Sequence, residues 1–419
     1  MKYFGTDGIR GIVGKKITPT LIKKVAKALV KYYSIHNLNR IILIGNDSRA
    51  SSDYISSIIQ SVLLKHGIKI ENVGVCSSPC LAYLTKRFNY PLSIMISASH
   101  NSKEYNGIKF FNSNGEKCGD DFELELESLI GKRINSSPSF SNYKNVENIK
   151  QNYISYLKRI KKNNISCIFD CAFGGTSDIV KNLFPKHEKL HINYNGNNIN
   201  ENAGCMHIET LQSICRIKKK IGFAFDGDGD RITVVSEKGN VITGDKILYI
   251  LSKFYLKSGD NLIGTLYTNS GLEKALKSRN INLIRAKVGD KYVYEKMQET
   301  SSILGGEDAG HIIMKHFSNT GDGLLIAILI SNIVHMSKLS LEELVSGYNE
   351  HFQSTANIEN KTLSQSSIQN LIEKFSPFSR VIIRPSGTEP VIRILVESEN
   401  ENNAKEILKK LLLEIKNIN

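Results

Sequence analysis

The sequence has little proline, few cysteines and no long uninterrupted apolar run. Proline provides 8 and glycine 31 of the 419 residues, which excludes collagen-like and low-complexity proteins. The 7 cysteines are an odd number. Their closest pairs, Cys76/Cys80 and Cys167/Cys171, lack the C-x-x-C spacing typical of structural zinc sites. We therefore expect reduced thiols and a cytoplasmic protein.

No segment is suited to enter a membrane. The stretch MKYFGTDGIR places Gly5, Asp7 and Gly8 where a secretory signal needs its apolar core. The most apolar run, LLIAILISNIV (324–334), is interrupted by Ser331 and Asn332. We expect no contact with a membrane.

The excess of positive charge does not indicate a nucleic-acid partner. The chain has 55 Lys and Arg against 41 Asp and Glu, a net charge of +14. The lysines are scattered over predicted helices instead of forming one stripe with aromatic residues, and an AT-rich genome produces such a Lys-, Asn- and Ile-rich composition. We expect no nucleic acid, and the charge remains compatible with an anionic small molecule.

The dominant pattern is an alternation of strand-length apolar runs with amphipathic helices. At roughly 100–200 residues per domain, we expect two to four domains. Three blocks share this α/β pattern, with apolar strands that end in small or acidic loops, which suggests an internal repeat. The last block predicts a smaller α+β module with a polar helix from about Ser354, two strands and a closing helix. The predicted boundaries are 1–145, 146–242, 243–350 and 351–419.

The loop SASHN (97–101) follows a strand that is apolar on both faces. Ser99 and His100 should therefore lie at the carboxyl edge of a sheet, where open α/β sheets bind ligands. A hydroxyl beside an imidazole suggests an activated nucleophile, although adjacent residues point in different directions. Taken alone, the pair is explained better by a loop serine with a capping role than by an activated nucleophile.

The segment FAFDGDGDRITVV carries the most specific signal. Asp226, Asp228 and Asp230 alternate with Gly227 and Gly229 between two strands, so the carboxylates should lie close together on a tight backbone. Three such charges repel one another unless a cation joins them. Hard oxygen ligands favour Mg²⁺ or Ca²⁺ over zinc, and the segment therefore predicts a divalent cation site.

This segment also has two alternatives. An EF-hand calcium loop would use the same aspartates and Glu237, but it requires glycine where Arg231 stands. An aspartyl phosphatase would use Asp226 as its nucleophile and Asp228 as the second carboxylate. The third carboxylate and Arg231 fit a metal site better than that enzyme, and phosphopeptide mapping after incubation with a phosphosugar separates the two.

Two further loops suit a phosphorylated sugar. RPSGTEPVIR (384–393) joins two strands through small and hydroxyl residues flanked by arginines, which is typical of a phosphate clamp, although a hairpin turn with incidental arginines is an alternative. GGEDAGH (305–311) offers a carboxylate and an imidazole for sugar hydroxyls, and a solvated turn would look similar. The candidate residues are Arg384, Ser386, Gly387, Thr388 and Arg393 in the first loop, and Glu307 and His311 in the second.

Taken together and in this order, six loops resemble those of the α-D-phosphohexomutase superfamily. They are GTDGIRG (5–11), SASHN, NGIKFF (106–111), DGDGDR (226–231), GGEDAGH and RPSGTEP (384–390). The stretches NINENAGCMH (198–207), VGDKYVYEKM (288–297) and NTGDGLL (319–325) are most similar to the bacterial phosphoglucosamine mutases. The resemblance implies three similar α/β domains and a smaller α+β C-terminal domain that binds phosphate, arranged around a central cleft.

The same resemblance implies a role for each candidate residue. Ser99 would carry a transferable phosphoryl group, and its phosphate would share one Mg²⁺ per chain with Asp226, Asp228 and Asp230. His100, Lys109 and Arg10 would flank it. We favour Lys109 as acceptor of the substrate hydroxyl proton, because a cation near Mg²⁺ and Arg10 should have a lowered pKa. Substrate would be held by Arg231, Glu307 and His311 at the sugar, and by Arg384, Ser386, Gly387, Thr388 and Arg393 at the unreacting phosphate.

The implied reaction interconverts glucosamine 6-phosphate and glucosamine 1-phosphate through a 1,6-bisphosphate, and it feeds amino-sugar nucleotide synthesis. The bisphosphate would also activate the enzyme. The bisphosphate must turn round, and we expect a hinge at about 346–357. Ala309 stands where the family usually has serine, so a phosphomannomutase/phosphoglucomutase is an alternative. A non-catalytic phosphosugar-binding relative is another. The expected partner is the phosphosugar, with a homodimer as a possible assembly.

Overall fold

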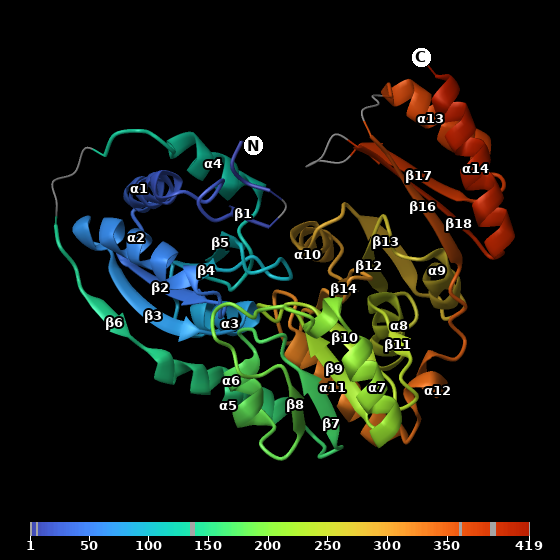
Figure 1. Ribbon diagram of the computed structural model, residues 1–419, viewed down its shortest axis with the longest axis horizontal. Helices are drawn as coiled ribbons and strands as arrows, with labels where there is room; N and C mark the ends of the chain where they lie inside the picture. Colours follow the sequence, from blue (N-terminus) through green and yellow to red (C-terminus); the bar gives the residue numbers. More distant parts are fainter. Residues whose placement is uncertain (1, 6, 135–138, 360–362, 386–390, 419) are drawn as a thin grey trace.

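The computed structural model describes residues 2–5, 7–134, 139–359, 363–385 and 391–418. These residues form four sheets, each with its own helices (Figure 1). The first sheet lies at the left of the view, the second at the bottom, the third to the right of the centre, and the C-terminal sheet at the upper right.

The first sheet has six strands in the order β1-β5-β4-β2-β3-β6. Helix α1 starts after Thr18, whose side chain accepts a hydrogen bond from the Leu21 N–H, and it packs against α2 and α4. The strands are β1 (Ile9–Ile12), β2 (Ile41–Asn46), β3 (Lys69–Val75), β4 (Leu92–Ile96), β5 (Tyr105–Asn112) and β6 (Tyr143–Asn145); the helices are α1 (Pro19–Ile35), α2 (Ser51–Lys65), α3 (Ser78–Arg87) and α4 (Asp120–Leu129).

The second and third sheets have five and four strands. The second unit contains η1 (Glu147–Ile149), α5 (Lys150–Ile160), β7 (Cys167–Asp170), α6 (Ser177–Leu183), β8 (Glu188–Leu190), η2 (Gly204–Met206), α7 (Glu209–Lys218), β9 (Ile221–Phe225), β10 (Ile232–Val235) and β11 (Val241–Ile242). The third contains α8 (Gly244–Tyr255), β12 (Asn261–Thr265), α9 (Ser270–Lys277), β13 (Asn282–Ala286), α10 (Asp290–Glu299), β14 (Leu304–Gly306), β15 (Ile312–Met314), α11 (Gly323–Ser337) and α12 (Leu341–Val345).

These three sheets repeat one arrangement of strands. Within them, the orders β3-β2-β4-β5, β8-β7-β9-β10 and β13-β12-β14-β15 are equivalent. In each case the first three strands in the chain are parallel, and the fourth pairs antiparallel with the third. The loop between the third and fourth strands therefore leaves the carboxyl edge of each parallel sheet, the edge at which such sheets bind ligands. The predicted repeat is confirmed.

The C-terminal unit has a three-stranded antiparallel sheet in the order β16-β18-β17, with α13 and α14 packed against it. Figure 1 shows both helices on the outer side of the sheet. The elements are β16 (Phe352–Glu359), α13 (Gln365–Phe375), β17 (Arg380–Pro385), β18 (Val391–Ser398) and α14 (Glu401–Asn417). The expected class, three similar α/β domains and a smaller α+β domain, is confirmed; the boundaries between the units stay predictions.

One expectation about this unit is wrong, and a second, the hinge, stays a prediction. The polar segment from about Ser354 belongs to strand β16, and the predicted polar helix starts only at Gln365. Half of the expected hinge (346–357) is therefore a paired strand, since β16 runs along the whole of β18. This strand is hard to recognise in the sequence FQSTANIE, because its side chains alternate between exposed and half-buried positions and few of them are apolar.

The apolar run at 324–334 forms most of the buried helix α11. No helix in the described part of the chain is long and apolar enough to cross a membrane. All seven cysteines are free thiols.

Candidate active site where three sheets meet

The structure brings together the loops that follow the third strand of each repeated sheet. Ser99 lies in the β4–β5 loop, and its Oγ donates a hydrogen bond to Asp226 Oδ2 in the β9–β10 loop. His311, at the end of the β14–β15 loop, has its Nδ1 3.7 Å from Asp230 Oδ1. Segments separated by more than 200 residues in the chain thus form one site because the repeated fold places their loops at equivalent sheet edges.

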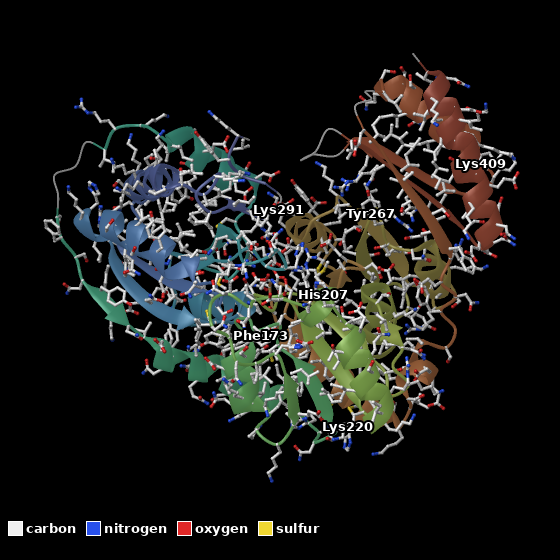
Figure 2. The ribbon with its side chains drawn as sticks, viewed as in Figure 1. Phe173, His207, Lys220, Tyr267, Lys291 and Lys409 are labelled. Atoms are coloured by element: carbon white, nitrogen blue, oxygen red, sulfur yellow. The ribbon has the colours of Figure 1, made fainter. Side chains whose placement is uncertain are left out.

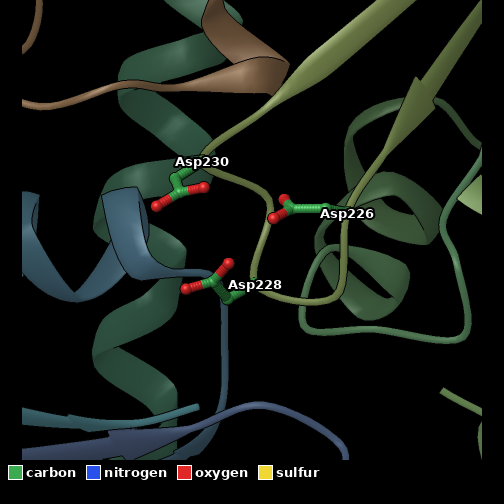
Figure 3. A group of neighbouring side chains, drawn as sticks. All are labelled: Asp226, Asp228 and Asp230. Atoms are coloured by element: carbon green, nitrogen blue, oxygen red, sulfur yellow. The ribbon is translucent and has the colours of Figure 1, made fainter. Parts of the chain in front are cut away.

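The three aspartates between β9 and β10 form a compact group of buried carboxylates (Figure 3). One oxygen of each lies within 4.8 Å of the others. Burial, with the charges of Asp230 and Asp228, raises the pKa of Asp226 to about 7. Within the described structure, Asp228 Oδ1 and Asp230 Oδ1 are buried without a hydrogen-bond partner. Mutual repulsion and unsatisfied acceptors are what a divalent cation would relieve, so these residues fit a metal ion.

The EF-hand alternative does not fit this geometry. Strand β10 begins at Ile232, immediately after Arg231, and pairs along its length with β9. Glu237 is not in the group of close oxygens. The loop is therefore a short connection between two strands and not a twelve-residue calcium loop.

Ser99 is held in an unusual backbone conformation. Its φ is +52°, in the left-handed region that costs a non-glycine residue roughly 1–2 kcal/mol. The residue is 1% exposed, and its Oγ lies 3.4 Å from His100 Nδ1 in addition to the contact with Asp226. Burial, together with Arg231 and Arg10, lowers the pKa of His100 to about 4, so its imidazole is uncharged at neutral pH.

A glycine allows the aspartate loop to approach Ser99 closely. A Cβ atom at Gly227 would lie 2.6 Å from the Ser99 carbonyl oxygen and 3.1 Å from Asn200 Nδ2. No side chain fits in that space. The glycine predicted to permit a tight backbone is thus required by the contact between the two loops.

Lys109 projects from β5 into the same group of charges. Its Nζ lies 2.7 Å from both Asp228 Oδ2 and Asp7 Oδ2, and 3.7 Å from Asp230 Oδ2. Burial disfavours the charged ammonium, but these three carboxylates outweigh burial and raise the pKa of Lys109. The expected lowering of this pKa is therefore wrong in this structure, because the sequence did not show that three carboxylates surround the amine.

Lys117 is a functional candidate that the sequence analysis missed. Its Nζ forms ion pairs with Asp7 Oδ1 at 3.1 Å, with Asp230 Oδ2 at 3.2 Å, and with Asp290 Oδ2. These partners come from the first, second and third units, so one buried lysine joins all three. Asp7 and Asp290 lie in stretches that the resemblance used, but Lys117 carries no local signal because its partners are remote in the chain.

The other predicted residues of this site have defined partners. Arg10 donates to Asp7 Oδ2 at 2.6 Å and to Asn101 Oδ1 at 3.1 Å. Glu307 Oε1 accepts from the Gly289 N–H at 3.0 Å. His311 is 3% exposed and its Nε2 lies 3.1 Å from Asp290 Oδ2, so it packs beside the aspartate loop.

Arg231 is the next residue after the aspartate loop. Its backbone N–H donates to Asp226 Oδ1 at 3.3 Å. Its Nε is buried without a hydrogen-bond partner in the described structure, which suits an anionic ligand.

The two predicted clamp arginines lie side by side in the C-terminal sheet. Arg384 on β17 and Arg393 on β18 are direct cross-strand neighbours. Arg384 Nε donates to the Tyr267 hydroxyl at 2.7 Å, and its guanidinium lies 5.0 Å from the ring centre. Figure 2 shows Tyr267 where the third unit meets the C-terminal sheet. The remaining clamp candidates, Ser386, Gly387 and Thr388, lie outside the described residues.

Comparison with known proteins identifies the family of the chain. Three models of the phosphoglucomutase/phosphomannomutase family match it: alpha/beta/alpha domain I at residues 1–137, alpha/beta/alpha domain III at 243–351, and the C-terminal domain at 348–414. A phosphoglucosamine mutase of Dictyoglomus turgidum is 38% identical and aligns over 99% of this chain and 97% of its own. One from Bacillus cereus is 37% identical over 96% and 95%. The chain belongs to the phosphoglucosamine mutase family.

Solved structures agree on the fold. A phosphoglucomutase/phosphomannomutase family protein of Burkholderia thailandensis superposes with a TM-score of 0.83 at 20% identity, covering 99% of this chain and 97% of its own. An Aspergillus fumigatus N-acetylphosphoglucosamine mutase, solved with GlcNAc-6P and magnesium, gives a TM-score of 0.67 at 16% identity over 98% and 94%. The resemblance seen in the sequence is confirmed, and as a member of the phosphoglucosamine mutase family the protein is an isomerase of the phosphohexomutase type.

Proposed function

We propose that the protein interconverts glucosamine 6-phosphate and glucosamine 1-phosphate through a phosphorylated Ser99. The observation that carries the proposal is the contact between Ser99 Oγ and Asp226, which joins the candidate nucleophile to a buried triple-aspartate loop. The names of relatives that are 36–38% identical support the sugar. The product would serve amino-sugar nucleotide synthesis.

Asp226, Asp228 and Asp230, with a phosphate oxygen on Ser99, would hold one Mg²⁺ per chain. The ion would supply charge neutralisation for phosphoryl transfer, the role that such ions have in this chemistry. The magnesium in the Aspergillus fumigatus structure supports this choice of metal. Lys109 and Lys117 already balance part of the carboxylate charge, and a phosphoserine would add about −1.5 to −2.

The transfer takes place in two halves. In the first, the bond between Ser99 Oγ and phosphorus breaks while the hydroxyl at C1 of glucosamine 6-phosphate forms a new bond to that phosphorus. This gives the 1,6-bisphosphate. After the bisphosphate turns round, its 6-phosphoryl group returns to Ser99 and glucosamine 1-phosphate leaves. The same bisphosphate, added to enzyme that lacks phosphate on Ser99, would phosphorylate this serine and so act as the activator.

Proton movement at Ser99 involves groups within reach of its oxygen. In the first half reaction the C1 hydroxyl of the substrate loses a proton, and Ser99 Oγ gains one when its phosphate departs. In the second, the Ser99 hydroxyl loses a proton and the C6 oxygen of the sugar gains one. His100 is uncharged at neutral pH and adjacent to Ser99 Oγ, so it is placed to exchange that proton. Acceptance of the substrate's proton by Lys109 stays a prediction; in this structure its charge balances the aspartates.

The remaining candidates would hold the sugar phosphate. Arg231, Glu307 and His311 would contact the sugar beside the aspartate loop. Binding of the distant phosphate would orient the reacting end for in-line attack. The groups proposed for that phosphate are Arg384, Ser386, Gly387, Thr388 and Arg393.

A phosphomannomutase/phosphoglucomutase is the second candidate. Ala309 removes a hydroxyl from the β14–β15 loop, and the matching family models carry those names. Asp308 does not replace that hydroxyl freely, because its Oδ1 accepts the Asp245 N–H at 3.2 Å. The chemistry at Ser99 would be the same, and the sugar would differ.

Turnover of glucosamine, glucose and mannose 6-phosphates, each with Mg²⁺ and a trace of the matching bisphosphate, tests both candidates. We expect the highest kcat/KM for glucosamine 6-phosphate. In the same assay Ser99→Ala should lose activity by about 1000-fold or more, because it removes the group that accepts the phosphoryl. Circular dichroism provides the control that this variant folds. A folded Ser99→Ala with unchanged turnover would contradict the mechanism.

A further inference from the structure

The loop that carries Ser99 is held by a buried arginine that no step above uses. Arg49 lies after β2 and is 2% exposed. Its Nη2 donates to the carbonyl oxygens of Ser99 at 2.9 Å and Asn101 at 2.8 Å. Its Nη1 donates to the carbonyl oxygens of Tyr105, at 3.0 Å, and Ser102. One guanidinium thus binds three carbonyls of the loop between β4 and β5 and a fourth at the start of β5.

Asp47 connects the same arginine to the other side of Ser99. Its Oδ2 accepts from Arg49 Nε at 2.9 Å and from Ser97 Oγ at 2.7 Å. Ser97 Oγ in turn accepts the Ser99 N–H at 2.9 Å. The Ser99 carbonyl oxygen thus binds Arg49 directly, and the Ser99 N–H is connected to Asp47 through Ser97 Oγ. The Asp47–Arg49 pair is fully buried, so it fixes the two peptide planes next to Ser99, whose φ is left-handed.

A residue of the second unit binds the same two carbonyls. Asn200 is 8% exposed, and its Nδ2 donates to the carbonyl oxygens of Ser99 at 2.8 Å and Asn101 at 2.9 Å. It also lies next to Gly227, in the loop that carries Asp226. Asn200 therefore ties the position of the Ser99 backbone to the unit that provides the aspartates.

We propose that Arg49 and Asn200 are positioning residues that hold the backbone of Ser99 in its left-handed conformation and so direct its Oγ at the aspartate loop. A serine in the ordinary extended or helical region would point its Cβ elsewhere. The inference rests on the proposed function, in which Ser99 carries the phosphoryl group. Neither residue touches the reacting atoms.

Asn200→Ala is the most direct test, with Asn163→Ala as its matched control. Asn163 is also 8% exposed, and its Nδ2 also makes two hydrogen bonds, to Asn332 Oδ1 at 2.7 Å and Ser331 Oγ at 3.1 Å. Both variants lose a buried amide in the full-length protein, but only Asn200→Ala loosens the Ser99 loop. The measurements are kcat and KM for glucosamine 6-phosphate, the rate at which the 1,6-bisphosphate phosphorylates Ser99 (by rapid quench and intact mass), and thermal unfolding.

We expect Asn200→Ala to lower kcat and the phosphorylation rate together by about 10- to 100-fold, with KM changed less than about threefold, since displacement of a reacting group by about 1 Å has effects of this size. Asn163→Ala should keep both rates while its melting temperature falls. Wild-type rates for folded Asn200→Ala would overturn the assignment of Asn200, whatever the change in melting temperature.

Arg49→Lys is the second variant. Lysine keeps a positive charge next to Asp47 but cannot supply the planar guanidinium that reaches four carbonyls. We expect a loss of kcat at least as large as that of Asn200→Ala, and a folded Arg49→Lys with wild-type kcat would overturn the role of Arg49. If Arg49→Lys does not fold, Asn200→Ala decides the proposal.

The same measurements separate this inference from the proposed function. Wild-type protein that acquires phosphate on Ser99 while both variants keep wild-type rates would contradict only the positioning role. Wild-type protein that turns over without phosphate ever appearing on Ser99, together with an active Ser99→Ala, would contradict the proposed function itself.

Discussion

The junction of the first three units and the attachment of the C-terminal unit are built differently. At the first junction, Lys117 binds carboxylates of three units, of which Asp230 and Asp290 are buried and Asp7 is half-buried. At the second, the described contacts run mainly to one segment, residues 266–274. Arg380 donates to the carbonyl oxygens of Thr268 and Leu266, and Arg384 donates to Tyr267.

The two junctions hold different parts of the candidate site: the candidate nucleophile and metal ligands lie at the first, and the candidate phosphate-binding arginines lie at the second. Pulling the first junction apart would leave buried charges without partners, which is strongly unfavourable. The second junction includes half-buried and exposed groups, such as the exposed Lys274–Glu399 pair, and water can replace such contacts at little cost. The candidate nucleophile and metal ligands thus lie at the junction that is costly to open. We predict that the unit with the candidate phosphate-binding arginines shifts while a bisphosphate turns round.

The comparison predicts that Lys117→Met has the largest effect on stability. Removing this lysine takes one cation away from Asp7, Asp230 and Asp290 at once, and we expect local protection around the aspartate loop to fall by about 3–5 kcal/mol. Hydrogen exchange of the β9–β10 amides, read by mass spectrometry, measures this change. Lys274→Met, at the other junction, is the matched control and should leave exchange of these amides unaltered. Equal protection of these amides in Lys117→Met and wild type would contradict the view that the ion pairs of Lys117 hold the first junction together.

Magnesium should bind the first junction more tightly as pH rises. The folded pKa of Asp226 is raised from 3.8 to about 7, so the folded protein holds a proton that the unfolded chain has lost. Between these values this group therefore makes folding less favourable as pH rises. Mg²⁺ must displace that proton, so its affinity should weaken by up to about tenfold per pH unit below 7 and level off above it.

Calorimetric titration with Mg²⁺ at pH 6, 7 and 8 measures this dependence. Asp226→Asn should bind more weakly and lose the part of the pH dependence that comes from this carboxyl. An affinity that is independent of pH in the wild type would show that Asp226 holds no proton in this pH range, and wild-type affinity in Asp226→Asn would show that it is not a ligand.

The smallest expected effect concerns the second junction. Arg384→Lys keeps the charge but loses the planar fork, and we expect KM for glucosamine 6-phosphate to rise by about tenfold, because hydrogen bonds to charged groups contribute about 1.5–3 kcal/mol. Tyr267→Phe removes only the hydroxyl that accepts from Arg384, so its rise in KM should be smaller. Steady-state kinetics provides both values. A fall in kcat at constant KM in Arg384→Lys would place this arginine with the reacting groups instead.

Much of the fold and site could be predicted because its signals are local. The strand-length apolar runs, the alternation of aspartate with glycine at 226–230 and the loop after the strand ending at Ile96 each depend on neighbouring residues. Strand β16 was missed because it is polar and, in the described part of the chain, pairs only with β18, so its stability comes from a partner about 40 residues away.

The sequence by itself determined the two central loops of the site, since the residues of DGDGDR and SASHN are specified by local spacing, whereas Lys117 carries no local signal. Only the tertiary structure decided how they are charged and held. The pKa of Lys109 is raised by carboxylates at positions 7, 228 and 230, and the backbone of Ser99 is fixed by residues 49 and 200. Electrostatic interactions and hydrogen bonds depend on distance in space, and the sequence does not show which remote residues the folded chain brings within that distance.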